Sequence, residues 1–398
     1  MILSPALWAD ASFEQWKQSF KQEAVSDGID ATLFDKALHQ ISPDPAVIKL
    51  DTSQPEFTRN IWDYIDNATS AKRLKRGQKL LQKHSLLFDD LEKQYGVQRE
   101  IIVAIWAMES DFGRNYGSKN VLRSLATLAH HARSEKREKF AKEELLAALH
   151  IIQDNKFKVG SLIGSWAGAM GQPQFMPSSY LKYAVDKNGD GQKNIWETEA
   201  DVFASIANFL KESGWRELED WGVEVNLPND FDWKLNTSAY ELRFAQWRVM
   251  GVMNASGQSF GDPERLASLF IPAGRYGPRF LVTHNFQVIK KYNKSLSYTL
   301  AVAQLSRLFA GGASIRIAWP RGDKALSHDQ IKEIQTLLNK DNHNSGEADG
   351  KIGSKTREAI RTWQLENGFA GDGYATLALL KTLRNKEKEK DTPPLLHE

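Results

Sequence analysis

The chain has 398 residues, enough for two or three domains with a sizeable core. Its 52 Lys and Arg nearly cancel its 50 Asp and Glu, so overall charge does not favour binding to nucleic acid or to an acidic membrane surface. The absence of cysteine excludes disulfides, thiolate metal sites and a cysteine nucleophile. No stretch approaches the roughly 20 apolar residues of a membrane span.

The first eleven residues, 1–11, are mostly apolar and end in small side chains. They are similar to the remnant of a secretory signal, although a basic first region and a full apolar core are missing from them. We therefore expect a signal remnant at residues 1–11, followed by the folded protein.

Helical periodicity dominates residues 12–319. Apolar residues recur at steps of three and four in the segments 13–25, 74–91, 101–108, 145–152, 202–210 and 299–309. The alternation typical of strands is sparse and is best at 240–244 and 279–282. These patterns predict one large, mainly α domain over residues 12–319.

Proline and glycine interrupt the pattern at residues 320–325, which we predict to be a linker. Residues 326–384 then form a compact unit with two amphipathic helices and a third apolar run, which predicts a small three-helix domain. The remaining residues, 385–398, begin with a run of charges that is typical of a solvated, frayed end.

The segment 101–108 is apolar on every face, so its helix should be buried. Glu109 follows it, and Gly113 is placed to end the helix. A carboxyl group at this position is partly desolvated, which raises its pKa towards the range of a general acid. The pattern alone favours a solvent-facing glutamate at a helix end, since such helix ends are common.

No convincing second carboxylate accompanies Glu109 in the motifs. Most glycosidases use two carboxylates, one as the acid and one as the nucleophile or base. A lone acid needs another source of nucleophile, and the substrate itself can supply one.

Residues 186–197 fit the EF-hand calcium loop at every specified position. The expected ligands are oxygen atoms of Asp186, Asn188, Asp190, Gln192 (through its backbone carbonyl) and Glu197. Helical patterns flank the loop at 178–185 and 200–210. Calcium sensors carry paired loops, whereas a single loop inside a larger domain is typical of a structural site. We therefore predict one bound Ca²⁺ with a structural role.

A segment rich in glycine and proline, 164–180, precedes the calcium loop. Its glycines allow the backbone to approach a ligand closely, and Ser165, Gln172 and Gln174 offer neutral hydrogen-bonding groups suited to sugar hydroxyl and acetamido groups. No Gly-Lys-Ser/Thr follows, so this is not a phosphate loop. Composition alone is also consistent with an ordinary turn-rich loop.

The motif AGAMGQPQFMPSSY (167–180), followed at once by the calcium loop, resembles the lytic murein transglycosylase B family, glycoside hydrolase family 103. Upstream, AIWAMESDFGRNYG (104–117) resembles the end of that family's catalytic helix. Downstream, IKKYNKSLSYTLAV (289–302) is similar to its late substrate-facing helix. The resemblance spans roughly residues 12–318 in the same order, and it implies a lysozyme-like catalytic domain with Glu109 as the catalytic residue.

Residues 326–384 are similar to the small three-helix peptidoglycan-binding domain, through the motifs at 334–339, 349–364 and 373–380. Two modules therefore point to the same polymer. The alternative interpretation of this unit is a stabilising appendage, because fold similarity alone does not establish a function.

The resemblance implies that Glu109 performs both proton transfers. It would protonate the oxygen between N-acetylmuramic acid and N-acetylglucosamine, and would then accept the proton of the muramyl C6 hydroxyl. That hydroxyl attacks C1 in place of water, which gives a 1,6-anhydromuramyl end. An isolated carboxyl suits this reaction because the internal hydroxyl replaces the second carboxylate and its water.

The resemblance also implies sugar-binding residues. Ser165 would position the reacting muramyl unit, and the further candidates are Gln174, Tyr292, Asn293, Tyr298 and Tyr116. Each of them is also compatible with a packing or turn role. The family has arginines near the substrate in the region of 129–142, where this sequence offers Arg133 and Arg137 without distinguishing between them.

The expected partner is the peptidoglycan glycan strand, with no nucleic acid and no integral membrane span, bound by a monomer. Since this polymer lies outside the cytoplasmic membrane, we expect a soluble periplasmic protein. The alternatives are a muramidase that uses water and a non-catalytic peptidoglycan-binding protein. A calcium sensor is a further alternative, against which the single calcium loop argues.

Overall fold

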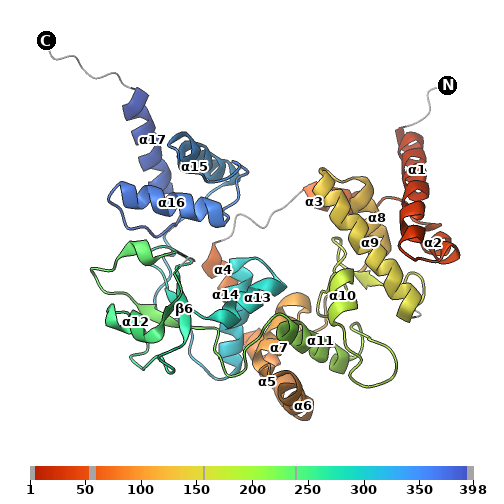
Figure 1. Cartoon of the computed structure of the whole chain (residues 1–398), viewed down its shortest axis with the longest axis horizontal. Coiled ribbons are helices and arrows are strands. Elements are labelled where there is room, and N and C mark those ends of the chain that lie inside the picture. The colour runs from red at the N-terminus through yellow and green to blue at the C-terminus, as the bar shows by residue number, and fades with distance from the viewer. Residues whose placement is uncertain (1–4, 53–59, 156, 238–239, 392–398) are drawn as a thin grey trace. The chain divides into compact units, whose positions relative to one another are not determined.

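A computed structural model of the chain describes residues 5–52, 60–155, 157–237 and 240–391. The fold is mainly helical, as predicted (Figure 1). Its contacts divide the chain into two compact units, Met1–Gln54 with Lys75–Ser213 and Pro55–Leu74 with Gly214–Glu398. The division thus falls at residue 213, whereas the sequence pattern is interrupted near residue 320. The early segment Pro55–Leu74 belongs to the second unit because α4 (Ile61–Ala68) packs against α14 (Leu296–Phe309).

The first unit is a group of helices with one very short two-stranded ladder. Its elements are α1 (Pro5–Ser26), α2 (Ala31–Leu38), α3 (Pro45–Thr52), α5 (Ala71–Lys83), α6 (Ser85–Tyr95), α7 (Arg99–Ser110), β1 (Lys119–Asn120), α8 (Val121–His130), α9 (Glu135–Asn155), β2 (Ile163–Gly164), α10 (Pro177–Tyr183) and α11 (Glu199–Glu212). The predicted segment 74–91 is divided at His84 into α5 and α6. Helix α1 begins at Pro5, inside the predicted signal remnant, of which residues 1–4 lie outside the described part.

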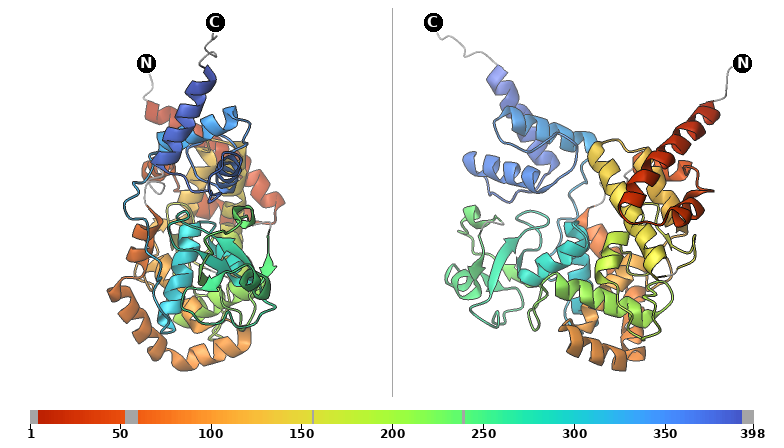
Figure 2. Two further views of the ribbon diagram at one scale, coloured as in Figure 1. Left: turned by 90° about the vertical axis from the view of Figure 1, so that its left-hand side faces the viewer. Right: turned by 45° about the vertical axis from the view of Figure 1, so that its right-hand side comes forward.

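Helix α7 lies at the centre of this unit because its sequence is apolar on every face. Its residues from Ile101 to Ala107 are buried. Helix α11 packs against both α6 and α7, and Phe203 of α11 contacts the Trp106 ring edge to face, with 4.8 Å between ring centroids. Helices α8 and α9 pack against each other (Figure 2). Burying the whole of α7 fixes the position of its C-terminal turn.

The second unit contains a five-stranded antiparallel sheet with the strand order β4-β6-β7-β3-β5. The strands are β3 (Gly222–Asn226), β4 (Leu242–Arg243), β5 (Met253–Asn254), β6 (Leu266–Phe270) and β7 (Phe280–Val282). The alternating segments 240–244 and 279–282 correspond to β4 and β7, but the prediction missed the other three strands. These strands are short, and β3 pairs with β7 more than fifty residues later, which no local pattern can reveal.

Helices complete the second unit, together with one 3₁₀ turn, η2 (Trp233–Leu235). They are α4, α12 (Phe244–Val249), α13 (His284–Tyr292), α14, α15 (His328–Lys340), α16 (Ser354–Glu366) and α17 (Leu377–Asp391). The segment 289–302 is therefore not one helix, because residues 293–295 separate α13 from α14. Ser295 begins α14, and its hydroxyl accepts the N–H of Tyr298.

Helices α15, α16 and α17 share a core that includes Ile334, Ile360 and Trp363 (Figure 2). The buried amide of Gln335 joins its loops, since it donates to the Lys351 carbonyl at 3.0 Å and accepts the Gly350 N–H at 2.8 Å. Helix α17 continues to Asp391. The predicted frayed end is therefore wrong for residues 385–391, and 392–398 lie outside the described residues.

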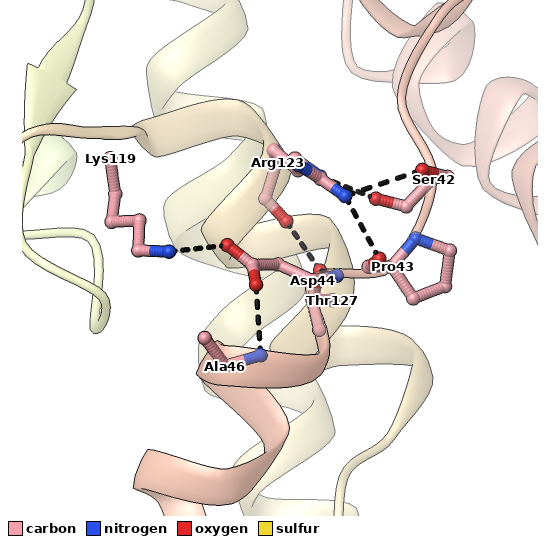
Figure 3. Close-up of polar contacts among 7 residues, drawn as sticks. All are labelled: Ser42, Pro43, Asp44, Ala46, Lys119, Arg123 and Thr127. Carbon is pink, nitrogen blue, oxygen red and sulfur yellow. Dashed lines mark hydrogen bonds and ion pairs between the residues drawn. The ribbon is translucent and has the colours of Figure 1, made fainter.

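A buried carboxylate, Asp44, connects the chain before α3 to β1 and α8 in the first unit (Figure 3). It accepts hydrogen bonds from the Lys119 ammonium at 2.8 Å and from the Ala46 N–H at 2.9 Å. Its own N–H donates to the Thr127 hydroxyl, and Arg123 donates to the Ser42 and Pro43 carbonyls. The hydrogen bond from Lys119 lowers the pKa of Asp44.

We expect the substitution Asp44→Asn to lower the free energy of unfolding by about 1–3 kcal/mol near neutral pH, because it leaves the Lys119 ammonium without its charged partner. A carboxyl group whose pKa is lowered in the folded state stabilises the fold above its unfolded pKa, near 4, and loses this contribution as the pH falls through the folded pKa. Urea titrations from pH 7 to pH 3 should therefore show the difference from the native protein shrinking below about pH 4.

The control is Asp35→Asn, which removes an exposed ion pair with Lys21. It should change stability by less than about 1 kcal/mol at any pH. A difference for Asp44→Asn that does not vary with pH would contradict the assigned pKa direction.

Candidate active site

Glu109 lies in the last turn of α7, partly exposed beside the buried Ala107 and Ser110. The helix ends immediately after Ser110, because Asp111 and Phe112 both take left-handed backbone conformations, with φ of 51° and 60°. The Asp111 N–H still donates to the Ala107 carbonyl at 3.1 Å. Asp111 therefore ends the helix in the left-handed conformation that Gly113 was expected to supply.

Packing around Phe112 supports this unusual helix end. The Phe112 ring is buried and contacts the Trp106 ring edge to face, with 5.5 Å between centroids. The Arg76 guanidinium lies 5.4 Å from the centre of the Phe112 ring. A non-glycine residue at positive φ is costly, so the buried ring holds the turn after Glu109 in place.

The glycine-rich loop that begins at Gly164 is held by its own hydrogen bonds. The Ser165 hydroxyl accepts the N–H groups of Ala167 at 3.3 Å and Ala169 at 3.0 Å, and the Ser165 N–H donates to the Ala169 carbonyl. A Cβ atom added at Gly164 would lie 2.0 Å from that carbonyl oxygen, so only glycine fits there. The loop is therefore a defined structure on which Ser165 has a fixed position.

Gln172 joins this loop to the helix that carries Glu109. Its side-chain oxygen accepts the Trp106 indole N–H at 2.7 Å, and its amide nitrogen donates to the Trp196 carbonyl at 2.7 Å. The Gln172 side chain also lies against Gly113, where an added Cβ would be 2.3 Å from its oxygen. All these groups are buried or half-buried, so the two loops are fixed relative to each other.

Three of the predicted sugar-binding residues belong to this group. Gln174 sits at a positive φ of 52° and donates to the backbone carbonyls of Tyr116 at 3.0 Å and Gly171 at 2.8 Å. Its amide therefore has a structural task, and it connects the Tyr116 loop to the Ser165 loop. The structure thus gathers Ser165, Gln174 and Tyr116 beside the segment that follows Glu109.

The other three candidates lie in the second unit. Tyr292 is the last residue of α13, and the Asn293 side chain accepts the Ser295 N–H at 3.0 Å in the short connection to α14. Tyr298 is only 4% exposed within α14, which favours a packing role for it. Contact of these residues with a substrate remains a prediction.

Both arginines of the segment 129–142 are engaged by a single carboxylate. Arg137 donates to Asp51 at 2.8 Å, and Arg133 donates to the Asp51 backbone carbonyl. Asp51 is buried at the end of α3. In this arrangement the two arginines connect α3 to the start of α9.

The predicted calcium loop is an open turn rich in backbone hydrogen bonds. The Asp186 carboxylate accepts the N–H groups of Gly189 and Gly191, each at 2.8 Å. The Asp190 carboxylate accepts the Gln192 N–H and the Asn188 amide, also at 2.8 Å. These side chains offer only oxygen ligands, which suit a hard cation such as Ca²⁺.

The loop 186–197 brings only some of the predicted calcium ligands together. The described residues contain no group of three or more His, Asp or Glu side chains placed to hold a metal ion, and Glu197 is exposed. The buried carboxylate of Asp201 stabilises the loop by accepting hydrogen bonds from the backbone N–H groups of Lys187 and Asn194, each at 2.8 Å. Burial raises the pKa of Asp201, and these two N–H groups counter that effect.

Comparison with known proteins identifies the family. A transglycosylase SLT domain model matches residues 12–307, and a peptidoglycan binding domain model matches residues 327–383. The first match covers more than half of the chain. The chain belongs to the transglycosylase SLT domain family. It is thus a member of the lytic transglycosylases, enzymes that act on peptidoglycan, as its motifs predicted.

Solved structures resemble most of the chain. SltB3 from Pseudomonas aeruginosa in complex with NAG-anhNAM-pentapeptide is 47% identical, over 94% of this chain and 99% of that protein, with a TM-score of 0.89. Escherichia coli Slt35 in complex with calcium is 30% identical, over 74% of this chain and 92% of that protein, with a TM-score of 0.64.

A curated relative matches a smaller share of this chain than the solved structures do. Membrane-bound lytic murein transglycosylase B of Escherichia coli (strain K12) is 36% identical over 221 residues, or 54% of this chain. The match spans 58% of that relative's length. In the part of our chain that the structure describes, no helix is both long and apolar enough to cross a bilayer.

We expect Gln172→Leu to lower the free energy of unfolding by about 2–4 kcal/mol, because it strands the buried Trp106 N–H and the Trp196 carbonyl without partners. Activity on peptidoglycan should fall more than the unfolded fraction explains, since the two loops lose their connection. The measurements are chemical denaturation and product release below the transition. Gln18→Leu, on the exposed face of α1, should leave both unchanged. Equal behaviour of the two variants would contradict the role of Gln172.

Proposed function

We propose that this protein cleaves the bond between N-acetylmuramic acid and N-acetylglucosamine in peptidoglycan without water, with Glu109 as its single catalytic carboxylate. The observation that carries the proposal is the position of Glu109, half-buried at a rigid helix end whose following segment is fastened to the glycine-rich loop. The family membership and the SltB3 complex with an anhydromuramyl fragment support the non-hydrolytic reaction.

The reaction balances with one carboxyl group. Neutral Glu109 donates its proton to the glycosidic oxygen as the bond from that oxygen to the muramyl C1 breaks. The resulting carboxylate accepts the proton of the muramyl C6 hydroxyl while O6 bonds to C1. No water is consumed, Glu109 ends in its starting state, and the product carries a 1,6-anhydro ring.

The loops around Glu109 and Ser165 would serve this reaction by holding the Glu109 carboxyl group at a fixed position relative to the substrate. A positioned acid and an internal nucleophile gain most when their geometry is fixed before reaction. The Gln172 and Gln174 hydrogen bonds fix the loop of Ser165 against the segment after Glu109. We assign Ser165 to positioning the muramyl unit and Tyr116, Tyr292 and Asn293 to weaker contacts with nearby sugars, whereas the burial of Tyr298 favours a packing role for it.

We further propose that the loop 186–197 binds Ca²⁺ as a structural ion. The ligands would be Asp186, Asn188, Asp190, the Gln192 carbonyl and Glu197, with Glu197 moving inward from its exposed position. The related Slt35 is known in complex with calcium. An ion here would brace the segment that ends at Trp196, to which Gln172 is hydrogen-bonded.

The C-terminal helices α15–α17 are proposed to retain the enzyme on its polymer. Their match to a peptidoglycan binding domain supports this role. Because the polymer is outside the cytoplasmic membrane, we place the protein in the periplasm and expect it to act there as a monomer.

The decisive test of the reaction is digestion of purified peptidoglycan by the native chain and by Glu109→Gln, followed by mass spectrometry of the muropeptides. The native chain should give products lighter by one water than hydrolysis products. Because Glu109 serves both steps, its replacement should lower the rate by at least about 10³-fold. Glu100→Gln, at the other end of α7, is the matched control and should stay active. Products with free reducing ends would instead indicate a water-using muramidase.

For the metal, we expect added CaCl₂ to raise the thermal midpoint of the chelator-treated protein, because a hundredfold excess of Ca²⁺ over Kd raises the free energy of unfolding by about 3 kcal/mol. Asp186→Ala should abolish this response, because it removes the first ligand and the acceptor of two loop N–H groups. Glu212→Gln, at the exposed end of α11, should respond as the native chain does. Equal midpoints with calcium and with chelator would exclude the site.

A further inference from the structure

A half-buried cation in the C-terminal helices lacks a hydrogen-bond acceptor for one of its donor atoms. The Nε of Arg357, on α16, is shielded from solvent and lacks a hydrogen-bond acceptor among the described residues. Tyr374 and Asp372 act on the guanidinium only through space, and burial lowers the pKa of Arg357. Shielding a donor atom of a charged group from water without an acceptor is costly, so an anion beside Arg357 would be favourable.

Arg357 lines a cavity of about 1030 Å³ within the second unit. One wall comes from β6, α13 and the residues that follow α13, and the other comes from α16 and its flanking loops. Apolar side chains such as Phe270, Ile271 and Ile352 line part of it, and Lys290 and Lys294 line another part. The cavity therefore combines apolar walls with positive charge.

The start of α16 adds to this positive character. Gly353 and Ser354 line the cavity, and Gly353 caps the helix without any side-chain acceptor. The first turn contains no acidic residue, so the partial positive charge of the helix N-terminus is not compensated by the chain. Arg357 lies one turn further along the same helix.

The acidic groups around the cavity are largely committed elsewhere. Glu358 is paired with Arg361. Asp372 accepts hydrogen bonds from the Gln364 amide at 2.8 Å and from the Arg275 backbone N–H at 3.0 Å. Glu241 is the remaining acid of the lining and is exposed. The lining thus keeps Arg357, Lys290 and Lys294 available to an anionic ligand.

The two walls are held together by hydrogen bonds, so the cavity is a built feature of the unit. The Asn236 amide donates to the Gly371 carbonyl at 2.9 Å, and Arg275 donates to Asp372 as described above. An added Cβ at Gly274 would lie 2.8 Å from the Tyr374 ring, which shows how closely the walls meet at this edge.

We propose that this cavity binds the carboxylate groups of the peptide stems of peptidoglycan, with Arg357 as the principal contact. The inference rests on the proposed function. It assigns binding of the peptide stems to this cavity, while Glu109 acts on the glycan. A stem offers both small apolar side chains and several carboxylates, which match the walls and the cations. A glycan segment fits less well, because Phe270 and Phe286 in the lining pack on each other, with 5.3 Å between centroids, and Phe286 is buried.

The test is calorimetric titration of the whole chain in the Glu109→Gln background with a free stem pentapeptide. Arg357→Met keeps the length of the side chain and removes its charge, and it should weaken binding about 10- to 100-fold, the usual effect of losing a charge-assisted hydrogen bond. Arg357→Lys should recover part of the affinity. Lys355→Met, on the same helix but outside the lining, makes the same change in charge and should bind normally.

A second measurement separates binding from a structural role. Because Arg357 is half-buried and its Nε has no acceptor, Arg357→Met should keep or raise the thermal midpoint, whereas a structural arginine would lower it. A pentapeptide with amidated carboxyl groups should bind the unchanged cavity as weakly as the free pentapeptide binds Arg357→Met.

Two results would overturn the proposal. One is equal affinity of Arg357→Met and Lys355→Met for the pentapeptide. The other is an Arg357-dependent interaction with stem-free glycan, whose muramyl lactyl groups carry free carboxylates, in place of the pentapeptide. Either result leaves the reaction untouched, since that is judged by the anhydro products of the native chain. Absence of those products would instead refute the proposed function.

Discussion

The structure of the catalytic unit depends on the two buried hydrogen bonds of the Gln172 side chain. The side-chain oxygen of Gln172 accepts the indole N–H of Trp106 in α7. Its amide nitrogen donates to the Trp196 carbonyl at the end of the predicted calcium loop. A single amide thus joins the helix of Glu109, the glycine-rich loop and the calcium loop. Buried polar groups are costly when they lack hydrogen-bond partners. The Trp106 N–H, the Gln172 amide and the Trp196 carbonyl all find partners only when the three segments are correctly placed.

This constraint bears on the proposed reaction, in which Glu109 alone serves as acid and base. That reaction would need few other catalytic groups, because the substrate would bring its own nucleophile. In that proposal the protein mainly supplies a fixed geometry, to which the contacts of Phe112, Gln172 and Gln174 would contribute. A calcium ion in the loop 186–197 would brace the same assembly from its far end.

The second unit carries a different kind of recognition. The cavity beside Arg357 holds the unpartnered Nε of that guanidinium together with the cations of Lys290 and Lys294. If the stems of the polymer occupy it, the chain holds peptidoglycan by its peptides in one place and acts on its sugars in another. The two tasks then require different residues, and variants can separate them.

The sequence by itself determined the family, the helices with strong periodicity and the position of Glu109 at the end of a buried segment, because these depend on local spacing and on motifs. It did not reveal the strands β3, β5 and β6, the division of the segment 289–302 into two helices, or the left-handed Asp111 that ends α7. Only the tertiary structure decided these features, together with the structural task of Gln174 and the unpartnered Nε of Arg357. Each depends on partners distant in the chain, and the energy of a strand pair or a buried polar contact is set by the partner and not by the residue alone.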